Sequence, residues 1–296
     1  MELNFKVLTR VGVDIGDGAL QLGSGHASTI LALFISRPGY TFAVHSIADA
    51  VWGPGRHPTS ADGSLQVYIS KLRRTLAEAG DGAPEISGGT GWYRFDFDPN
   101  QSDIGRFRSY ITQAEGAYRR SIPGAADLYR HALSEITGDI LAGLPATPFT
   151  TSFRAGVHEL ALDAELKMLD IGWNDVTAAD ATTRLTELAL AQPYNERIWS
   201  SLIDTLIRSG RRAEALLAAQ RLHHILSSTL GLDVHPHITD LLRDITPPDH
   251  NDNLQPRHSA RPLIIKASAQ LYDTTPLDHR SLERRPPPTT AVPLRS

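Results

Sequence analysis

The chain has 296 residues, of which 41% are hydrophobic, and it contains no cysteine. A chain of this length can bury sizeable cores, and without cysteine it cannot build a disulfide framework, an iron–sulfur site or a thiol nucleophile. Its longest apolar stretch is far shorter than the ~20 residues that cross a bilayer, and its N-terminus lacks the basic and apolar regions of a signal peptide, so we expect a cytoplasmic protein with no membrane partner.

The first 60 residues predict short strands followed by two helices. Strands are expected at Asn4–Val13 and Ala19–Leu22, with a Gly-Asp-Gly turn between them. The apolar run TILALFI belongs to a first helix, His26–Ser36. A second helix, Ser46–Val51, is expected to be capped by the hydroxyl group of Ser46 and to stop at the Trp-Gly-Pro sequence that follows it.

A longer helix is expected from about Ser64 onward. Its apolar residues recur at spacings of four, three and four and form one stripe that must face a core: Leu65, Ile69, Leu72 and Leu76. The opposite face carries Val67, Ser70, Lys71 and Arg74, with Gln66 and Arg73 at its shoulder. This face suits the major groove of DNA, because Arg and Lys reach guanine edges or phosphates and an exposed valine can meet a thymine methyl group. The alternative is an ordinary solvated face, which is the usual role of Lys/Arg clusters on amphipathic helices.

A β-hairpin is expected directly after this helix. The expected elements are a strand starting at Glu85–Ser87, a tight turn made by Gly88, Gly89 and Gly91, and a second strand at Trp92–Phe97. A helix followed by such a hairpin is a winged helix, and Arg94 is the cation nearest the turn of the wing. Residues 1–98 contain eight Lys and Arg against ten Asp and Glu, a net charge of −2, so the positive charge is confined to a small patch.

From Asp103 to about Ile245 the hydrophobic pattern is helical throughout. After two shorter helices, the expected segments are Phe153–Val176, Thr182–Ala191, Asn195–Ser209, Arg212–Leu230 and Ile238–Ile245. Small residues at close-packing positions favour degenerate tetratricopeptide-like helix pairs, with Trp199, Leu202, Leu206 and Leu216 in their core. A plain helical bundle that stabilises the first domain is the alternative.

The last 50 residues, 247–296, differ in composition from the rest. They hold nine of the 19 prolines, interleaved with Ser, Thr, Asn and Asp, which predicts a disordered tail. Seven Lys and Arg against five acidic residues give this segment a net charge of +2, enough only for weak nonspecific attraction to DNA.

The sequence contains no catalytic or metal-binding constellation. The stretch HELAL, which starts at His158, lacks the second histidine of the HExxH motif because Leu162 occupies that position. His235 and His237 flank a proline in a turn and have no acidic partner at a fixed spacing. The glycine-rich stretches GSGH and GGTG match no nucleotide-binding pattern. We therefore expect no enzymatic activity, no metal and no cofactor.

Three consecutive stretches, VHSIADAVWG, PTSADGSLQVYISKLRRTL and GTGWYRFDFDP, resemble the OmpR-type winged helix of the SARP (antibiotic regulatory protein) family of bacterial activators. The later segment LAQPYNERIWSSLIDTLIRSGRRAEALLAAQRLHHILSSTLGLDVHP resembles the bacterial transcriptional activation domain that follows the winged helix in this family. The resemblance covers roughly residues 1–246, and the order of the parts is more specific than any single motif.

The resemblance implies a mainly α protein with a small β component: a winged helix at 1–98, a tetratricopeptide-like helical domain at 99–246 and the tail at 247–296. It implies an activator that binds direct repeats in double-stranded DNA as a homodimer or as tandem copies, contacts RNA polymerase and sigma factor, and switches on a specialised-metabolite (antibiotic) gene cluster. The expected DNA contacts are Ser64, Gln66, Val67, Ser70, Lys71, Arg73, Arg74 and Arg94. The negative charge of residues 1–98 leaves a second interpretation open, a helical-repeat adaptor whose winged helix has lost its affinity for DNA.

Overall fold

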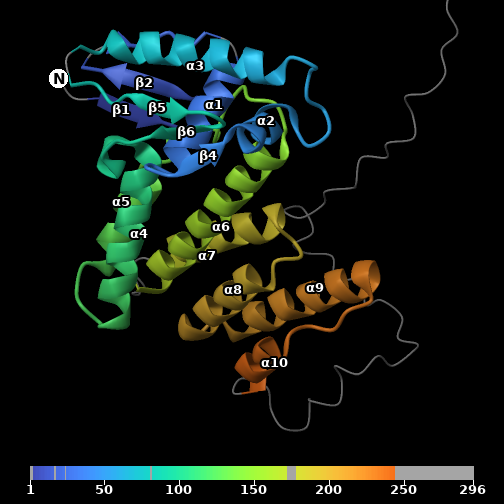
Figure 1. Ribbon diagram of the computed structural model, residues 1–296. Coiled ribbons are helices and arrows are strands. Elements are labelled where there is room, and N and C mark those ends of the chain that lie inside the picture. Colours follow the sequence, from blue (N-terminus) through green and yellow to red (C-terminus); the bar gives the residue numbers. More distant parts are fainter. Residues whose placement is uncertain (1–2, 17, 24, 81, 172–177, 244–296) are drawn as a thin grey trace, which may run out of the picture. The chain divides into compact units, whose positions relative to one another are not determined.

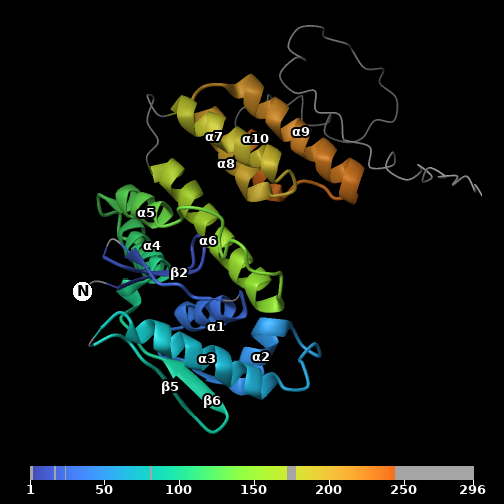
Figure 2. The ribbon, with the colours of Figure 1, turned by 90° about the horizontal axis from the view of Figure 1, so that it is seen from above.

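The computed structural model describes residues 3–16, 18–23, 25–80, 82–171 and 178–243 (Figures 1 and 2). The predicted tail lies outside the described residues, as do the last residues of the helices predicted at Phe153–Val176 and Ile238–Ile245. The described part is mainly helical and contains two small sheets, which confirms the predicted fold class.

The first sheet is a three-stranded antiparallel meander at the start of the chain. It consists of β1 (Leu3–Lys6), β2 (Gly12–Ile15) and β3 (Gly18–Ala19), with Leu3 opposite Ile15. The single strand predicted at Asn4–Val13 is therefore wrong, because the chain leaves the sheet after Lys6 and reverses. Val7 and Leu8 are fully buried there, and their backbone N–H groups bind a side chain from another part of the chain instead of a neighbouring strand.

The winged helix follows in the expected order. Its elements are α1 (Gly25–Ser36), β4 (Thr41–Ala43), α2 (Val44–Trp52), α3 (Ala61–Ala77), β5 (Ile86–Gly89) and β6 (Trp92–Phe95), and the second sheet has the order β4-β6-β5. The predicted cap at Ser46 is wrong, because α2 starts two residues earlier, directly from β4. The Val44 N–H donates to the carbonyl of Gly91 (3.0 Å), so the wing supplies the acceptor that a capping side chain would otherwise provide.

The largest core forms around α1, in which every residue from Thr29 to Ser36 is buried. The Phe95 ring from the wing packs between Phe5 of β1 (centroids 5.5 Å apart) and Phe34 of α1 (6.4 Å). Complete burial of each such side chain contributes roughly 1.5–3 kcal/mol. This core extends past the boundary predicted at residue 98, because it includes Ile104, Phe107, Ala132, Ile140, Leu141 and Val157.

A short 3₁₀ helix, η1 (Pro99–Gln101), leads into α4 (Asp103–Arg119), which packs against α5 (Ala125–Ser134). The Ser102 hydroxyl accepts the Gly105 N–H (3.1 Å) and so caps α4. The buried Asp103 carboxylate accepts the N–H groups of Val7 (2.8 Å), Leu8 (2.8 Å) and Ile104 (2.6 Å). Burial raises the pKa of Asp103 to about 6, against the opposing effect of these hydrogen bonds.

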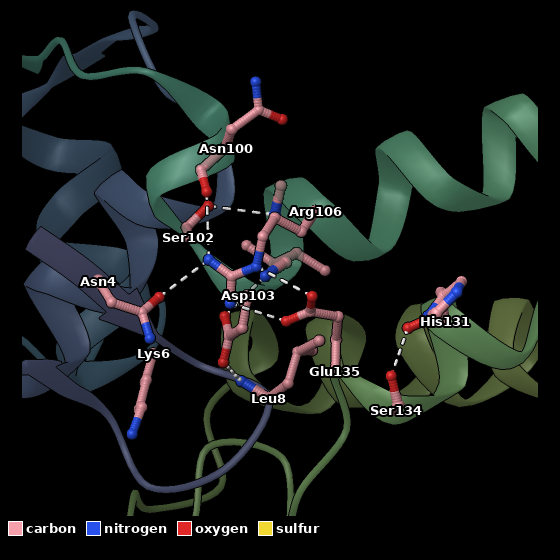
Figure 3. Close-up of polar contacts among 12 residues, drawn as sticks. Asn4, Lys6, Leu8, Asn100, Ser102, Asp103, Arg106, His131, Ser134 and Glu135 are labelled. Atoms are coloured by element: carbon pink, nitrogen blue, oxygen red, sulfur yellow. Dashed lines mark hydrogen bonds and ion pairs between the residues drawn. The ribbon is translucent and has the colours of Figure 1, made fainter. Parts of the chain in front are cut away.

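Arg106, one turn further along α4, connects β1 to the end of α5 (Figure 3). Its guanidinium group donates to both carboxylate oxygens of Glu135 (2.9 and 2.7 Å), to Asn4 Oδ1 (3.0 Å) and to the carbonyl of Asn100 (3.1 Å). Together, Asp103 and Arg106 join the first strand to the helices that follow the wing. We call this pair, with its partners, the α4 junction.

The long helix α6 (Pro148–Ile171) packs against α5 and α2. Its start is fixed by the buried Thr147, whose Oγ1 donates to the carbonyl of Ala50 in α2 (2.9 Å). Within α6, Arg154 donates to the carbonyls of Ile140, Leu141 and Leu144 and so holds the loop that precedes the helix.

The last described helices are α7 (Ala178–Ala191), α8 (Glu196–Arg208), α9 (Arg212–Leu230) and α10 (Pro236–Arg243). Consecutive members pack pairwise, α7 on α8 and α8 on α9, around a second core that contains Trp199, Leu202 and Leu206 as predicted. Leu216 is only half-buried and does not belong to this core, because α9 turns Ala215 and Ala219 inward instead. These small residues allow α8 and α9 to approach closely.

Candidate DNA-binding surface

The two faces of α3 have the predicted character. Leu65, Ile69, Leu72 and Leu76 are all buried in the core of the winged helix. On the other side lie the exposed residues Gln66, Val67, Ser70, Lys71 and Arg74, which we call the α3 outer face. Val67 keeps 52% of its surface in contact with solvent, although it is β-branched and apolar. Among the described residues, neither Lys71 nor Arg74 forms an ion pair.

Ser64 lies at the edge of this surface. The helix begins at Ala61, three residues before the predicted start, so Ser64 lies inside its first turn and its N–H donates to the Ser60 carbonyl (2.9 Å). Ser64 is half-buried. It therefore lies beside the α3 outer face and not within it.

Arg73 connects α3 to the wing. Its Nε donates to the carbonyl of Ile86 (2.7 Å), and its guanidinium carbon lies 5.8 Å from the centre of the Tyr93 ring. Figure 2 shows α3 alongside the β5–β6 hairpin that receives these contacts. The main contacts of Arg73 therefore hold the wing against the helix, at the side of the α3 outer face.

Arg94, on β6, is paired with Asp96, which follows the strand. It makes two hydrogen bonds to the Asp96 carboxylate, from Nε (2.6 Å) and from Nη2 (2.9 Å), and these contacts raise the pKa of Arg94. The charge of the one cation predicted on the wing is therefore largely neutralised in this structure.

The turn of the wing is shorter than predicted. Gly88 and Gly89 lie in β5, opposite Tyr93 and Trp92, and only Thr90 and Gly91 connect the strands. A Cβ atom at Gly88 would lie 2.5 Å from the Tyr93 ring, and one at Gly89 would lie 2.7 Å from the Trp92 indole. The two glycines are thus required because aromatic rings cross their backbone, whereas the positive φ of the turn falls on Gly91 (82°).

Arg56 is a candidate that sequence reasoning missed. It is exposed on the connection between α2 and α3, next to the exposed residues Thr59 and Ser60, and no ion pair involves it among the described residues. The connection is attached to α2 through His57, whose Nε2 lies 2.9 Å from Asp49 Oδ1. A cation between the two helices of a helix-turn-helix unit was the available signal, since exposed arginines often contact phosphates.

The described residues contain no group of three or more His, Asp or Glu side chains that could hold a metal ion. Within the same part of the chain, no helix has the length and apolar character needed to cross a membrane. The side chains of the α3 outer face can form hydrogen bonds, attract negative charge and make apolar contacts.

Two family descriptions match the chain. Residues 21–90 match "Transcriptional regulatory protein, C terminal", and residues 102–246 match "Bacterial transcriptional activator domain". The first match spans α1 to β5, including all of α3, and the second spans the helices from α4 to α10.

Several curated regulators are similar to this chain. The regulatory protein AfsR of Streptomyces coelicolor is 31% identical over 248 residues, which cover 83% of this chain and 24% of AfsR. The regulatory protein DnrI of Streptomyces peucetius is 26% identical over 219 residues, 69% of this chain and 77% of DnrI. The chain thus spans about a quarter of the length of the AfsR protein that it matches.

A solved structure has a similar fold. Mycobacterium tuberculosis EmbR in complex with low affinity phosphopeptide superposes with a TM-score of 0.75 at 24% identity, covering 87% of this chain and 66% of that one. The likeness supports the arrangement of a winged helix followed by a helical domain.

Proposed function

Because the chain belongs to the SARP family of transcriptional regulators, we propose that it is an activator that binds direct repeats in double-stranded DNA near a promoter. The α3 outer face would enter the major groove, with Ser64 and Arg73 at its edges. Arg94, on the wing, would contribute little while it is paired with Asp96.

The observation that carries this proposal is a pair of exposed cations, Lys71 and Arg74, which form no ion pair with any described residue and lie beside the exposed Val67. A buried stripe on the other side of the same helix fixes the direction in which all three point. Lysine and arginine bind guanine edges and phosphates, and a valine methyl group packs against thymine. This combination favours recognition of DNA bases over the role of an ordinary solvated helix face.

The charge of the winged helix favours binding by more than one copy. Residues 1–98 carry a net charge of −2, and the cation on the wing is neutralised by Asp96. A single copy should therefore bind weakly, because neutralisation of few phosphates releases few counterions. A homodimer or tandem copies on a direct repeat would supply the missing affinity through effective concentration.

The helices from α4 to α10 would hold neighbouring copies together and contact RNA polymerase and sigma factor. The match of this segment to a bacterial transcriptional activator domain supports that role. As the resemblance to the SARP (antibiotic regulatory protein) family implies, the target would be a specialised-metabolite (antibiotic) gene cluster, and the protein would act on the nucleoid in the cytoplasm.

Footprinting with the full chain on promoters near its own gene tests the proposal. We expect two protected sites in direct repeat. A titration on one half-site and on the tandem repeat should then give a steep gain in affinity for the tandem site. Protection without a repeat would contradict the proposed mode of binding.

The second candidate, a protein-interaction adaptor with a vestigial winged helix, is favoured by the net negative charge of residues 1–98 and by the absence of a cation in the two-residue turn of the wing. It requires equal, salt-insensitive and micromolar or weaker binding to single and tandem sites. The same titration therefore separates the two candidates.

A further inference from the structure

A hollow of about 440 Å³ lies where the winged helix meets the helices that follow it. Its walls come from the end of α1, from β4 and α2, and from α4 and the start of α6, and Figure 1 shows α6 beginning beside α2. The hollow is separate from the α3 outer face, because no residue of α3 lines it.

Two arginines, Arg37 and Arg108, line this hollow. Arg37 follows α1 and places its guanidinium carbon 5.5 Å from the centre of the Tyr40 ring, and Arg108 Nη1 donates to the carbonyl of Ser36 (2.7 Å). Neither forms an ion pair with any described residue. Burial, and then the charge of Arg37, lower the pKa of Arg108. Two like charges on the wall of one hollow attract an anion.

The remainder of the lining is largely apolar. The rings of Phe42, Phe149 and Phe153 border the hollow, and the centroids of the latter two lie 6.0 Å apart at an angle of 43°. One carboxylate, that of Asp49, also lines it, and its Oδ1 lies 2.9 Å from His57 Nε2. Two arginines and one aspartate leave one positive charge to compensate. Since the desolvation penalty of an ion rises steeply with its charge, such surroundings suit a monoanion with an apolar body.

Fixed contacts between the two sides of the hollow hold its walls in place. Thr147 Oγ1 donates to the Ala50 carbonyl (2.9 Å) and so attaches the start of α6 to α2. Thr150 Oγ1 donates to the Pro145 carbonyl (2.7 Å) and so holds the preceding segment against the first turn of α6. Thr147 and Thr150 are both buried. A hollow with fixed walls binds a ligand without the entropy loss of ordering a loop.

We propose that this hollow is a binding site for a small aromatic carboxylic acid, with the carboxylate between Arg37 and Arg108 and the ring against Phe149 and Phe153. The planar guanidinium groups match a carboxylate in geometry, and the phenylalanine rings offer apolar and edge-to-face contact. The proposal concerns ligand binding to the folded chain and does not depend on DNA binding.

Isothermal titration calorimetry of the full chain tests the proposal with three probes. The first is 2-naphthoate, the second is the neutral isostere 2-naphthamide, and the third is inorganic phosphate. We expect 2-naphthoate to bind at least tenfold more tightly than either of the others. Equal binding of the amide would show a merely apolar hollow, equal binding of phosphate would show a merely electrostatic one, and no binding of 2-naphthoate would leave no site; each result overturns the proposal.

Variants of the lining locate the ligand. Arg37→Gln and Arg108→Gln should each weaken binding of 2-naphthoate at least tenfold, and Ser152→Trp, at an exposed position of the lining, should block the hollow without removing a charge. Arg120→Gln is the matched control, because Arg120 is also an exposed arginine whose side chain donates to a backbone carbonyl, that of Gly116 (2.9 Å). Arg37 makes no side-chain hydrogen bond among the described residues, so its variant should fold even if Arg108→Gln does not. Undiminished binding in Arg37→Gln and Ser152→Trp would overturn the assignment.

Discussion

The α3 outer face and the α4 junction differ in how their charged side chains are paired. At the junction, Asp103 accepts three backbone N–H groups and Arg106 donates to three different residues. On the α3 outer face, Lys71 and Arg74 make no ion pair within the described part of the chain. The polar groups of the α4 junction are satisfied within the protein, whereas the cations of the α3 outer face are available to a binding partner.

This difference indicates where stability and where binding should respond to substitution. A buried polar group whose partner is removed imposes a desolvation penalty on the folded state, so changes at the junction should appear in the free energy of unfolding. An exposed cation contributes little to folding and acts through whatever it contacts. Substitutions in the two regions should therefore separate effects on folding from effects on binding.

The first prediction concerns pH and the carboxyl group of Asp103. Its pKa is raised from an unfolded value of 3.8 to about 6, so the folded state binds a proton more tightly than the unfolded state does. The stability contributed by the protonated group is fully present below pH 3.8 and is lost as the pH rises through about 6. The wild type should lose on the order of 3 kcal/mol relative to Asp103→Asn between pH 4 and pH 7.

Chemical denaturation of both proteins across this pH range measures that difference, and titrations common to both cancel in it. A difference that stays flat or rises with pH would contradict the assignment of a raised pKa to Asp103. The chemical shift of the Asp103 carboxyl carbon, followed by NMR as the pH is changed, gives the pKa of this carboxyl group as a second and independent readout.

The second prediction concerns Arg106. Arg106→Ala removes hydrogen bonds to Glu135, Asn4 and Asn100. It leaves the mostly buried carboxylate of Glu135 without its arginine partner. We expect a loss of about 2–3 kcal/mol in the free energy of unfolding. Arg130→Ala is the control, because the ion pair of Arg130 with Asp127 is exposed and should contribute less than ~1 kcal/mol. Equal losses in the two variants would mean that the junction has no special role.

The third prediction concerns the α3 outer face. Lys71→Ala and Arg74→Ala should each weaken specific DNA binding by ~1–3 kcal/mol if the side chain touches a base, or lower the salt slope by about one if it touches phosphate. The melting temperature should not change, since both side chains are exposed. Fluorescence anisotropy against salt concentration measures both quantities, and Arg212→Ala on α9 provides an exposed cation as control. Operator affinity that is unchanged in both α3 variants would exclude this helix as the reading element.

The sequence predicted the orientation of α3 correctly because one helical period determines which residues are buried and which are exposed. The same pattern could not show that Arg73 would contact the Ile86 carbonyl and the Tyr93 ring, since the wing is brought to the helix by tertiary packing. The pairing of Arg94 with Asp96 was closer to predictable, because residues two apart on a strand point to the same face. Reading charge along the strand would have found it.

The misplaced elements share a physical cause. Ser46 is a good capping residue, but β4 runs directly into α2 and the Gly91 carbonyl satisfies the first N–H group. The predicted strand Asn4–Val13 breaks because Val7 and Leu8 bond to Asp103, 95 or more residues away. Gly88 and Gly89 look like turn residues but serve ring packing in a strand. In each case a contact outside the element itself overrides a local preference: the partner is distant in sequence for the first two, and for the glycines it lies on the adjacent strand β6.

The fourth prediction, with the smallest expected effect, concerns the ion pair between Arg94 and Asp96 on the wing. Its removal should make the wing resemble the α3 outer face, whose cations are not paired with a described residue. Asp96→Asn removes the carboxylate that neutralises Arg94 and so leaves a free cation near the turn of the wing. If the wing approaches the phosphates, DNA affinity at low salt should rise and the slope of log affinity against log salt should steepen by about 0.9. Both side chains are exposed, so the melting temperature should stay the same. Asp127→Asn on α5, which removes the partner of Arg130, is the matched control and should leave the slope unchanged. A slope that is also unchanged in Asp96→Asn would mean that the wing stays away from the DNA backbone and that the α3 outer face binds alone.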